Sequence, residues 1–155
     1  MSTTLTLDLP DEAATQALGA RLARLARPGD VILLFGTLGT GKSTLARAFI
    51  RALTSPDEEV PSPTFTLVQA YEAETADIWH FDLYRLDKPE DAYELGIEDA
   101  FLDGVSLIEW PERLGGLAPR RRLDLNLETG SAETARRATL TSHGQWDDRL
   151  KDLPA

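Results

Sequence analysis

The periodicity of hydrophobic and polar positions changes several times along the chain. Residues 5–9 alternate in the manner of a strand, and residues 11–27 repeat leucine at helical spacing behind an acidic start. Residues 31–36, with the sequence VILLFG, carry no polar side chain, which is typical of a parallel strand covered by helices on both faces. The first part of the chain therefore predicts a strand, a helix and a strand in turn, the order of an α/β fold.

The rest of the chain continues this alternation and ends in strands. A second helix is expected after residue 42, because four apolar side chains there share one stripe, and residues 54–64 form a polar, proline-rich loop. Residues 120–128 and 135–143 alternate as strands and can pair antiparallel through the polar link between them. The other expected elements are strands over residues 64–72, 77–84 and 105–110 and a short helical segment near residues 89–96.

Composition narrows the classes of protein to which the chain can belong. Its 155 residues, 42% of them hydrophobic, suffice for one core, so we expect a single domain over residues 1–155. The absence of cysteine excludes disulfides, thiolate metal sites and cysteine nucleophiles, and two histidines disfavour a histidine-built zinc site. The sequence shows no secretory signal and no membrane span, so we expect a cytoplasmic protein. A net charge of −10 opposes broad contact with nucleic acid or anionic lipid.

A glycine-rich stretch lies between the buried strand and the second helix. Residues 36–43, GTLGTGKS, fit the P-loop pattern G-x-x-x-x-G-K-[ST] in the strand-to-helix position that this motif requires. The glycines let backbone N–H groups converge on phosphate oxygens, and the helix adds the positive end of its dipole. Lys42 is expected to reach outward to the β- and γ-phosphates, and Ser43 to offer a hydroxyl to Mg²⁺. Nucleotide binding is favoured over a plain glycine-rich turn. The expected fold is a three-layer, P-loop NTPase-like sheet, mostly parallel, with antiparallel strands toward the C-terminus.

The nucleotide and the metal site can be narrowed further. Guanine-specific GTPases commonly use an N-K-x-D loop, which the chain cannot build from its single asparagine, so ATP is the expected nucleotide. Asp82 and Glu109 each stand where an apolar strand meets its C-terminal loop, the ligand side of an open α/β sheet. Either carboxylate can hold Mg²⁺ or its waters. His80, two residues before Asp82, is interpreted as a buried strand histidine rather than a catalyst.

Aromatic and basic side chains outside the P-loop receive ordinary structural interpretations. Arg85 follows a predicted strand and can face either a partner or the nucleotide. The only dense basic runs, residues 120–122 and 136–137, lie far from the P-loop in sequence. Four aromatic residues alternate within strand patterns and are expected mostly in the core or on the sheet, namely Phe65, Trp79, Phe81 and Tyr84.

Five segments follow one another between residues 5 and 115: GTLGTGKSTL, PSPTFTLVQAY, HFDLYRL, ELGIEDAF and LIEWPERL. In content, order and spacing they resemble the motifs of the TsaE family, formerly called YjeE, and this set is far more specific than a P-loop alone. The resemblance implies a small bacterial P-loop ATPase that is required for threonylcarbamoyladenosine formation at position 37 of tRNAs that read ANN codons. It also implies action together with the proteins TsaB and TsaD.

The resemblance suggests roles for individual residues. Thr64 resembles a switch-like threonine near the γ-phosphate, and Asp82 resembles the family's Walker B acid. Ser43, which replaces the threonine commoner in the family, is placed with Glu109 at the Mg²⁺ site, although which carboxylate binds the metal directly stays open. Glu12 resembles a residue near the nucleotide base. Phosphate contacts are implied for Gly39, Thr40, Gly41, Lys42, Ser43 and Thr44.

The resulting expectation is a Mg²⁺-dependent ATPase that drives or resets a protein assembly, with Lys42, Thr64, Asp82 and Glu109 as its catalytic residues. Trp110 is expected on the surface that faces either a partner or the nucleotide. One alternative is a small-molecule P-loop kinase, which would need an acceptor pocket and usually an arginine-bearing lid. Another is a binding module whose hydrolysis is incidental. Tight direct binding of tRNA is not expected, because 26 acidic residues oppose 16 basic ones.

Overall fold

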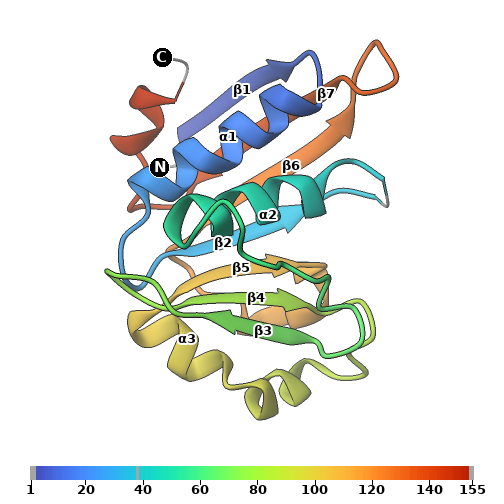
Figure 1. Cartoon of the computed structure of the whole chain (residues 1–155). Helices are drawn as coiled ribbons and strands as arrows, with labels where there is room; N and C mark the ends of the chain where they lie inside the picture. Colours follow the sequence, from blue (N-terminus) through green and yellow to red (C-terminus); the bar gives the residue numbers. More distant parts are fainter. Residues whose placement is uncertain (1–2, 38, 154–155) are drawn as a thin grey trace.

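The computed structural model describes residues 3–37 and 39–153, which form one seven-stranded sheet with helices on both of its faces (Figure 1). The strands are β1 (Thr3–Leu9), β2 (Val31–Phe35), β3 (Val68–Tyr71), β4 (Ile78–Asp82), β5 (Val105–Glu109), β6 (Leu123–Thr129) and β7 (Arg136–Ser142). The α-helices are α1 (Glu12–Leu25), α2 (Lys42–Leu53) and α3 (Ile97–Asp103), and the 3-10 helices are η1 (Pro89–Leu95), η2 (Pro111–Leu117) and η3 (Arg149–Asp152).

The sheet is parallel at its centre and antiparallel at both edges. Its order is β1-β7-β6-β2-β5-β4-β3, and the four strands from β6 to β4 are mutually parallel. The antiparallel pairing of β6 with β7 confirms the expectation for the last two strands. β1 and β3 add antiparallel pairs, with β7 and β4 respectively, that the sequence pattern did not predict. The expected α/β fold with a mostly parallel sheet is therefore confirmed.

Alternate residues of the central strand supply two separate cores, one on each face of the sheet. Ile32 and Leu34 of β2 belong to the core beneath α1 and α2. Val31 and Leu33 point the other way, into the core beneath α3, η1 and η2. Because successive side chains of a strand face opposite sides, an unbroken apolar run is what a strand covered on both faces requires. The result is a three-layer arrangement with helices above and below the sheet (Figure 1).

Several segments differ from the predicted elements: η2 and η3 were not expected, and two further differences involve expected elements. The strand expected over residues 64–72 is shorter, because β3 begins only at Val68. The residues before it form a turn, in which the N–H of Leu67 donates to the carbonyl of Pro63 at 2.7 Å and Leu67 has a left-handed φ of 69°. The second difference is α3, which continues the predicted short helical segment after a break at Gly96, where φ is 82°.

The expectation that the aromatic residues lie mostly in the core or on the sheet is wrong for two of them. Phe81 is fully buried, whereas Phe65 and Tyr84 are 79% and 47% exposed. Phe65 lies in the turn before β3, and Tyr84 follows the end of β4, so neither side chain is directed by the pleat of the sheet. Both aromatic side chains therefore belong to the surface beside the loops rather than to the core.

The strand directions bring distant parts of the chain to one edge of the sheet. The four parallel strands end there, and so does β1, while β7 begins there because it runs against β6. The starts of α1 and α2 follow the ends of β1 and β2 at this edge.

Among the helices of the described residues, none combines the length and the apolar character needed to cross a membrane.

Candidate functional site

The loop between β2 and α2 has backbone conformations that only glycine adopts readily. Gly41, the residue before α2, has a φ of 98°. Gly36 has a φ of 145°, and a Cβ atom there would lie 2.6 Å from Thr40 Oγ1 and 2.8 Å from the carbonyl oxygen of Leu127. A side chain at either position would therefore strain or displace the loop. Leu38, which belongs to the predicted motif, lies outside the described residues.

The N-terminus of α2 presents backbone donors to the space in front of it. Gly41 supplies no capping side chain, and the first turn of the helix contains no acidic residue. The first N–H groups of a helix have no partner within the helix, and the helix dipole places partial positive charge at the same end. Such an end binds phosphate or another anion.

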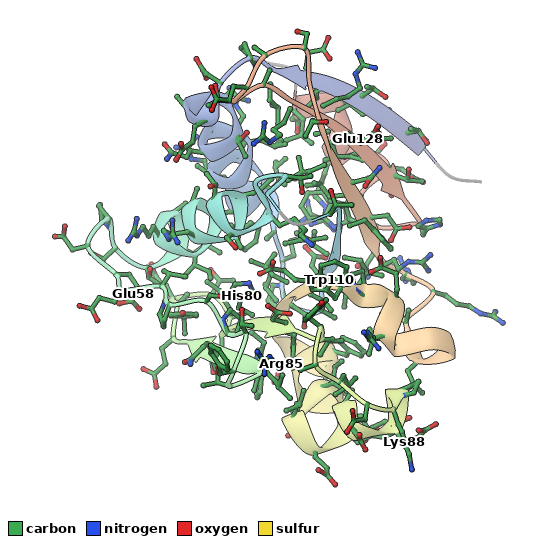
Figure 2. All side chains as sticks on the ribbon, turned by 90° about the vertical axis from the view of Figure 1, so that its right-hand side faces the viewer. Glu58, His80, Arg85, Lys88, Trp110 and Glu128 are labelled. Carbon is green, nitrogen blue, oxygen red and sulfur yellow. The ribbon has the colours of Figure 1, made fainter. Side chains whose placement is uncertain are left out.

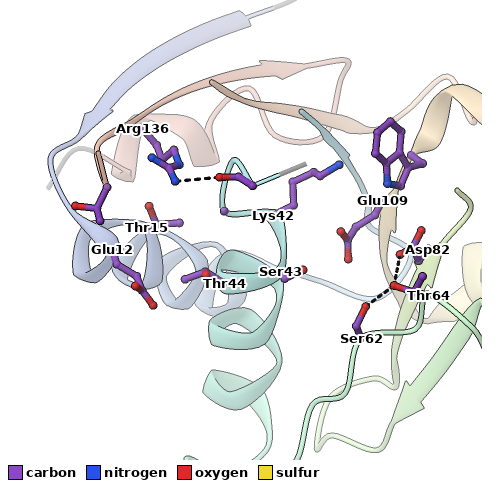
Figure 3. Close-up of a pocket in the computed structure, with 14 residues that line it drawn as sticks. Glu12, Thr15, Lys42, Ser43, Thr44, Ser62, Thr64, Asp82, Glu109 and Arg136 are labelled. Carbon is purple, nitrogen blue, oxygen red and sulfur yellow. Dashed lines mark hydrogen bonds between the residues drawn. The ribbon is translucent and has the colours of Figure 1, made fainter. Parts of the chain in front are cut away.

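A pocket of about 310 Å³ opens directly at this helix end, among residues from six regions of the sequence (Figure 3). Nine of the ten predicted site residues line it: Glu12, Gly39, Gly41, Lys42, Ser43, Thr44, Thr64, Asp82 and Glu109. Thr40 is the exception, because it is 2% exposed and its hydroxyl donates to the carbonyl of Thr37 at 2.8 Å. Its side chain therefore stabilises the conformation of the loop and does not face the pocket.

Lys42 lies differently from the outward position expected of it. The residue is only 6% exposed, and its Nζ donates to the carbonyl of Gly36 at 2.6 Å. The same ammonium group lies 4.0 Å from the centre of the Trp110 ring, within the range of a cation–π contact. Lys42 still lines the pocket, but its charged end is shared between the loop backbone and an aromatic face.

The electrostatic surroundings of Lys42 combine two opposing influences. Burial lowers the pKa of Lys42 below its ordinary value of 10.5, because the charged form loses hydration. The carboxylates of Glu109, Glu112 and Asp82 act in the opposite direction, and the loss of hydration outweighs them. The pocket thus holds a cation whose charge is expensive to bury, next to acidic side chains. A phosphate chain would give this cation a further anionic partner.

Asp82 and Glu109 end neighbouring parallel strands and lie opposite each other in the register of β4 and β5. Each is 5% exposed. Residues that pair in this way have side chains on the same face of the sheet, and here it is the face covered by α2. The two carboxylates therefore stand side by side at the floor of the pocket, across from Lys42 and Ser43 (Figure 3).

The two carboxylates differ in how their oxygen atoms are used. Asp82 Oδ1 accepts from the N–H of Tyr84, and Asp82 Oδ2 accepts from the hydroxyl of Thr64, both at 3.1 Å. Glu109 Oε2 lies 2.7 Å from Nε2 of His80. Glu109 Oε1 has no hydrogen-bond partner within the described part of the chain. Glu109 therefore has an uncommitted oxygen for a ligand, and Asp82 does not.

The donor set suits a hard divalent cation that keeps oxygen ligands from water and phosphate. The hydroxyl of Ser43 and the carboxylate of Glu109 both line the pocket, and oxygen is the ligand atom that Mg²⁺ prefers. Residues 3–37 and 39–153 contain no group of three or more His, Cys, Asp and Glu that could hold a metal unaided. This fits Mg²⁺ better than Zn²⁺, because Mg²⁺ is usually held by one or two protein groups together with substrate phosphates.

Thr64 is held at the pocket by the turn that shortens β3. Besides its bond to Asp82, its Oγ1 lies 2.7 Å from the hydroxyl oxygen of Ser62 (Figure 3). The neighbouring residue, Phe65, points outward, and the guanidinium carbon of Arg85 lies 4.5 Å from the centre of its ring. The loop thus joins a polar group inside the pocket to an exposed aromatic side chain outside it.

Arg136 is the main site residue that the sequence pattern does not predict. From the start of β7 it reaches the P-loop, where Nε donates to the carbonyl of Thr40 and Nη2 to that of Gly39, both at 3.0 Å. Figure 3 shows the second of these bonds. Its Nη1 donates to the carbonyls of Glu133 and Ala135. Arg136 therefore ties the β6–β7 turn to the phosphate loop. Three further lining residues were not predicted, namely Thr15, Ser62 and Thr134.

Comparisons with known proteins give one family. The sequence model described as "Threonylcarbamoyl adenosine biosynthesis protein TsaE" matches residues 9–138. The chain is 38% identical over 152 residues to the "tRNA threonylcarbamoyladenosine biosynthesis protein TsaE" of Rickettsia conorii, a match that covers 94% of this chain and 87% of the relative. It is 33% identical to the protein of the same name from Bacillus subtilis, with 91% and 86% covered. The crystal structure of YdiB from Bacillus subtilis superposes with a TM-score of 0.79 at 27% identity, covering 98% of this chain and 94% of that chain.

Proposed function

This chain belongs to the TsaE family of threonylcarbamoyl adenosine biosynthesis proteins, and from that premise we propose that it binds ATP with Mg²⁺ and hydrolyses it. The observation that carries the proposal is the meeting of an uncapped helix N-terminus, Lys42 and two buried carboxylates in one pocket. Backbone donors and a cation suit the phosphate chain, and the carboxylates suit its metal. The reaction serves the formation of threonylcarbamoyladenosine in tRNA.

The residues divide the work according to their positions. The amides at the start of α2 bind the phosphates, and Lys42 turns from the Gly36 carbonyl to the phosphate chain. Ser43 and Glu109 would hold Mg²⁺, which would neutralise charge on the phosphates. Thr64 and Asp82, already bonded to each other, orient the attacking water at the γ-phosphate side.

The opposite side of the pocket receives the nucleoside. Glu12 follows Asp11, whose side chain caps α1 by accepting from the N–H of Ala14 at 2.9 Å. This cap fixes the start of α1 at the pocket rim, and Thr15 stands one turn further along the same helix. A carboxylate at the rim can accept from the exocyclic amine of adenine. This supports ATP as the nucleotide.

The partners are the proteins TsaB and TsaD, with which this chain acts as a nucleotide-dependent component. The exposed Phe65 supports docking beside the pocket, because it follows Thr64 directly and so moves with any change of the loop at the γ-phosphate. Arg85, stacked on Phe65, adds a cation to that surface. Partner binding and nucleotide state are therefore coupled through a single turn.

The test is phosphate release from ATP by the purified chain, measured alone and then with TsaB and TsaD. We expect slow release alone and faster release with the partners, and we expect Lys42→Ala to abolish both. Lys151→Ala is the matched control, because Lys151 has a side chain 77% exposed and lies in η3 rather than in the pocket. Unchanged release by Lys42→Ala would refute the site. Transfer of phosphate to a small-molecule acceptor instead of water would favour the alternative function, a small-molecule P-loop kinase.

A further inference from the structure

His80 occupies a position in β4 where an aliphatic side chain would be ordinary. It is 2% exposed and lies between Ile78 and Asp82 on the α2 face of the sheet, where Ile78 belongs to the apolar core. Figure 2 shows His80 well inside the molecule, whereas Glu58 and Lys88 lie at its periphery. A buried imidazole in such a place needs a reason beyond packing.

The strand register explains why His80 meets Glu109. β4 and β5 are parallel, with His80 opposite Leu107 and Asp82 opposite Glu109. All four side chains therefore share one face, and His80 lies one pleat deeper than the two carboxylates. From there its ring reaches sideways to the neighbouring strand, and Nε2 comes to 2.7 Å from Glu109 Oε2.

The hydrogen bond fixes the direction of the contact. A carboxylate can only accept, so Nε2 of His80 carries the proton and donates it. Nδ1, the other ring nitrogen, is buried and has no partner within the described part of the chain. A buried polar atom without a partner is unfavourable, so the imidazole is a costly way to fill this space. The imidazole does, however, provide one N–H group that donates to Glu109.

We propose that His80 is a positioning residue that holds Glu109 Oε2 and thereby directs Glu109 Oε1 toward Mg²⁺ in the pocket. The inference rests on the proposed function, because it assigns Glu109 to the metal. A ligating carboxylate that is itself hydrogen-bonded has fewer orientations to lose when the metal binds. Asp82 receives the corresponding restraint from Thr64 and the Tyr84 backbone, and Glu109 receives it from His80.

The test compares ATP affinity in Mg²⁺ with ATP affinity in EDTA for the full chain and three variants. His80→Leu removes the N–H group, His80→Gln keeps an amide N–H near the position of Nε2, and Ile78→Ala disturbs the same strand and face without touching Glu109. We expect His80→Leu to weaken ATP binding about tenfold or more in Mg²⁺ and to leave binding in EDTA unchanged. His80→Gln should recover most of the loss, and Ile78→Ala should not change the Mg²⁺ dependence.

A second measurement needs no variant to fold. In the ¹⁵N-labelled natural chain, the Nε2 signal of His80 should be that of a protonated nitrogen, and it should shift when Mg²⁺ is added to the ATP-saturated protein. An unprotonated Nε2, or an Nε2 chemical shift that does not change when Mg²⁺ is added, overturns the positioning role. So does His80→Leu with the natural Mg²⁺ dependence, or Ile78→Ala with the same loss as His80→Leu.

The same data separate this inference from the proposed function. If the natural chain binds ATP no better in Mg²⁺ than in EDTA, no metal site exists and both proposals fall. If the natural chain depends on Mg²⁺ and Glu109→Ala removes that dependence, the metal assignment stands. Failure of the His80 variants then counts against the positioning role alone.

Discussion

At the scale of single residues, the partners of each carboxylate oxygen distinguish two acids that the sequence leaves equivalent. Asp82 has both oxygens engaged within the protein, by Thr64 and by the Tyr84 backbone. Glu109 has one oxygen engaged by His80 and the other uncommitted among the described residues. Glu109 Oε1 thus keeps both of its acceptor sites for a metal, whereas each oxygen of Asp82 already accepts one hydrogen bond that restrains the side chain. The two acids are thus suited to different tasks.

The first prediction concerns these two acids. Glu109→Ala should remove most of the Mg²⁺ dependence of ATP affinity, because it deletes the carboxylate with an uncommitted oxygen. Asp82→Ala should keep that dependence and lower turnover about a hundredfold, because the attacking water loses a group that orients it and can accept its proton. Binding titrations and phosphate release on the same samples measure both effects. The reverse ranking would exchange the two roles.

The second prediction concerns the buried charge of Lys42. Its pKa is lower in the folded protein than its ordinary value of 10.5, chiefly because of burial. Between the two values the unfolded chain binds more protons than the folded one, so the free energy of unfolding rises with pH in that range. Relative to Lys42→Met, the natural chain should therefore gain stability as the pH is raised from neutral toward about 10. Urea unfolding of both proteins across this range measures the difference. A difference that is constant or falls with pH would contradict the burial of this charge.

At the scale of elements, the strand and helix pattern was largely predictable and the long-range neighbours were not. Apolar periodicity located β2, α1 and α2, and strand-like alternation located β6 and β7. Nothing in the sequence states that β6 lies beside β2, yet this pairing brings the start of β7 and Arg136 to the P-loop. The nine predicted pocket residues lie in motifs or at strand ends, where local pattern is informative. Arg136 and the His80–Glu109 contact depend on register across the sheet.

The third prediction tests the contact between the β6–β7 turn and the P-loop. Arg136→Ala removes bonds from a charged donor to two P-loop carbonyls, and such bonds contribute about 1.5–3 kcal/mol each to stability. We expect the free energy of unfolding to fall by at least the contribution of one such bond, about 1.5–3 kcal/mol, and ATP affinity to fall with it. The control is Arg137→Ala, since Arg137 pairs on the surface with Asp8 and should change stability by less than about 0.5 kcal/mol. Equal effects of the two variants would exclude a special role for Arg136.

At the scale of the whole molecule, the net negative charge of the chain disfavours binding of nucleic acid. The chain carries 26 acidic and 16 basic residues, so its overall field repels phosphate. The dense basic run at residues 120–122 is partly neutralised, because Arg122 is paired with Asp124 at 2.9 Å. Arg136, from the other run, is committed to the P-loop. The overall acidic charge therefore opposes broad contact with the phosphates of a tRNA.

The fourth prediction follows from this distribution of charge. The purified chain should not bind tRNA with a dissociation constant below about a micromolar near physiological salt, since each neutralised phosphate needs a free Lys or Arg. Fluorescence anisotropy of labelled tRNA, repeated at several salt concentrations, measures this directly. Tighter binding with a steep salt dependence would contradict the prediction and would make residues 120–122 the first place to mutate.

The central claim, that the pocket at the start of α2 is a Mg²⁺-dependent ATP site, is tested most directly by calorimetric titration of ATP into the natural chain with and without Mg²⁺. The predicted result is saturable binding of one ATP per chain, weaker without Mg²⁺ and lost in Lys42→Ala. Lys151→Ala should bind as the natural chain does, because its exposed side chain lies in η3, outside the pocket. Absence of saturable binding, or equal affinity of the natural chain and Lys42→Ala, would contradict the claim.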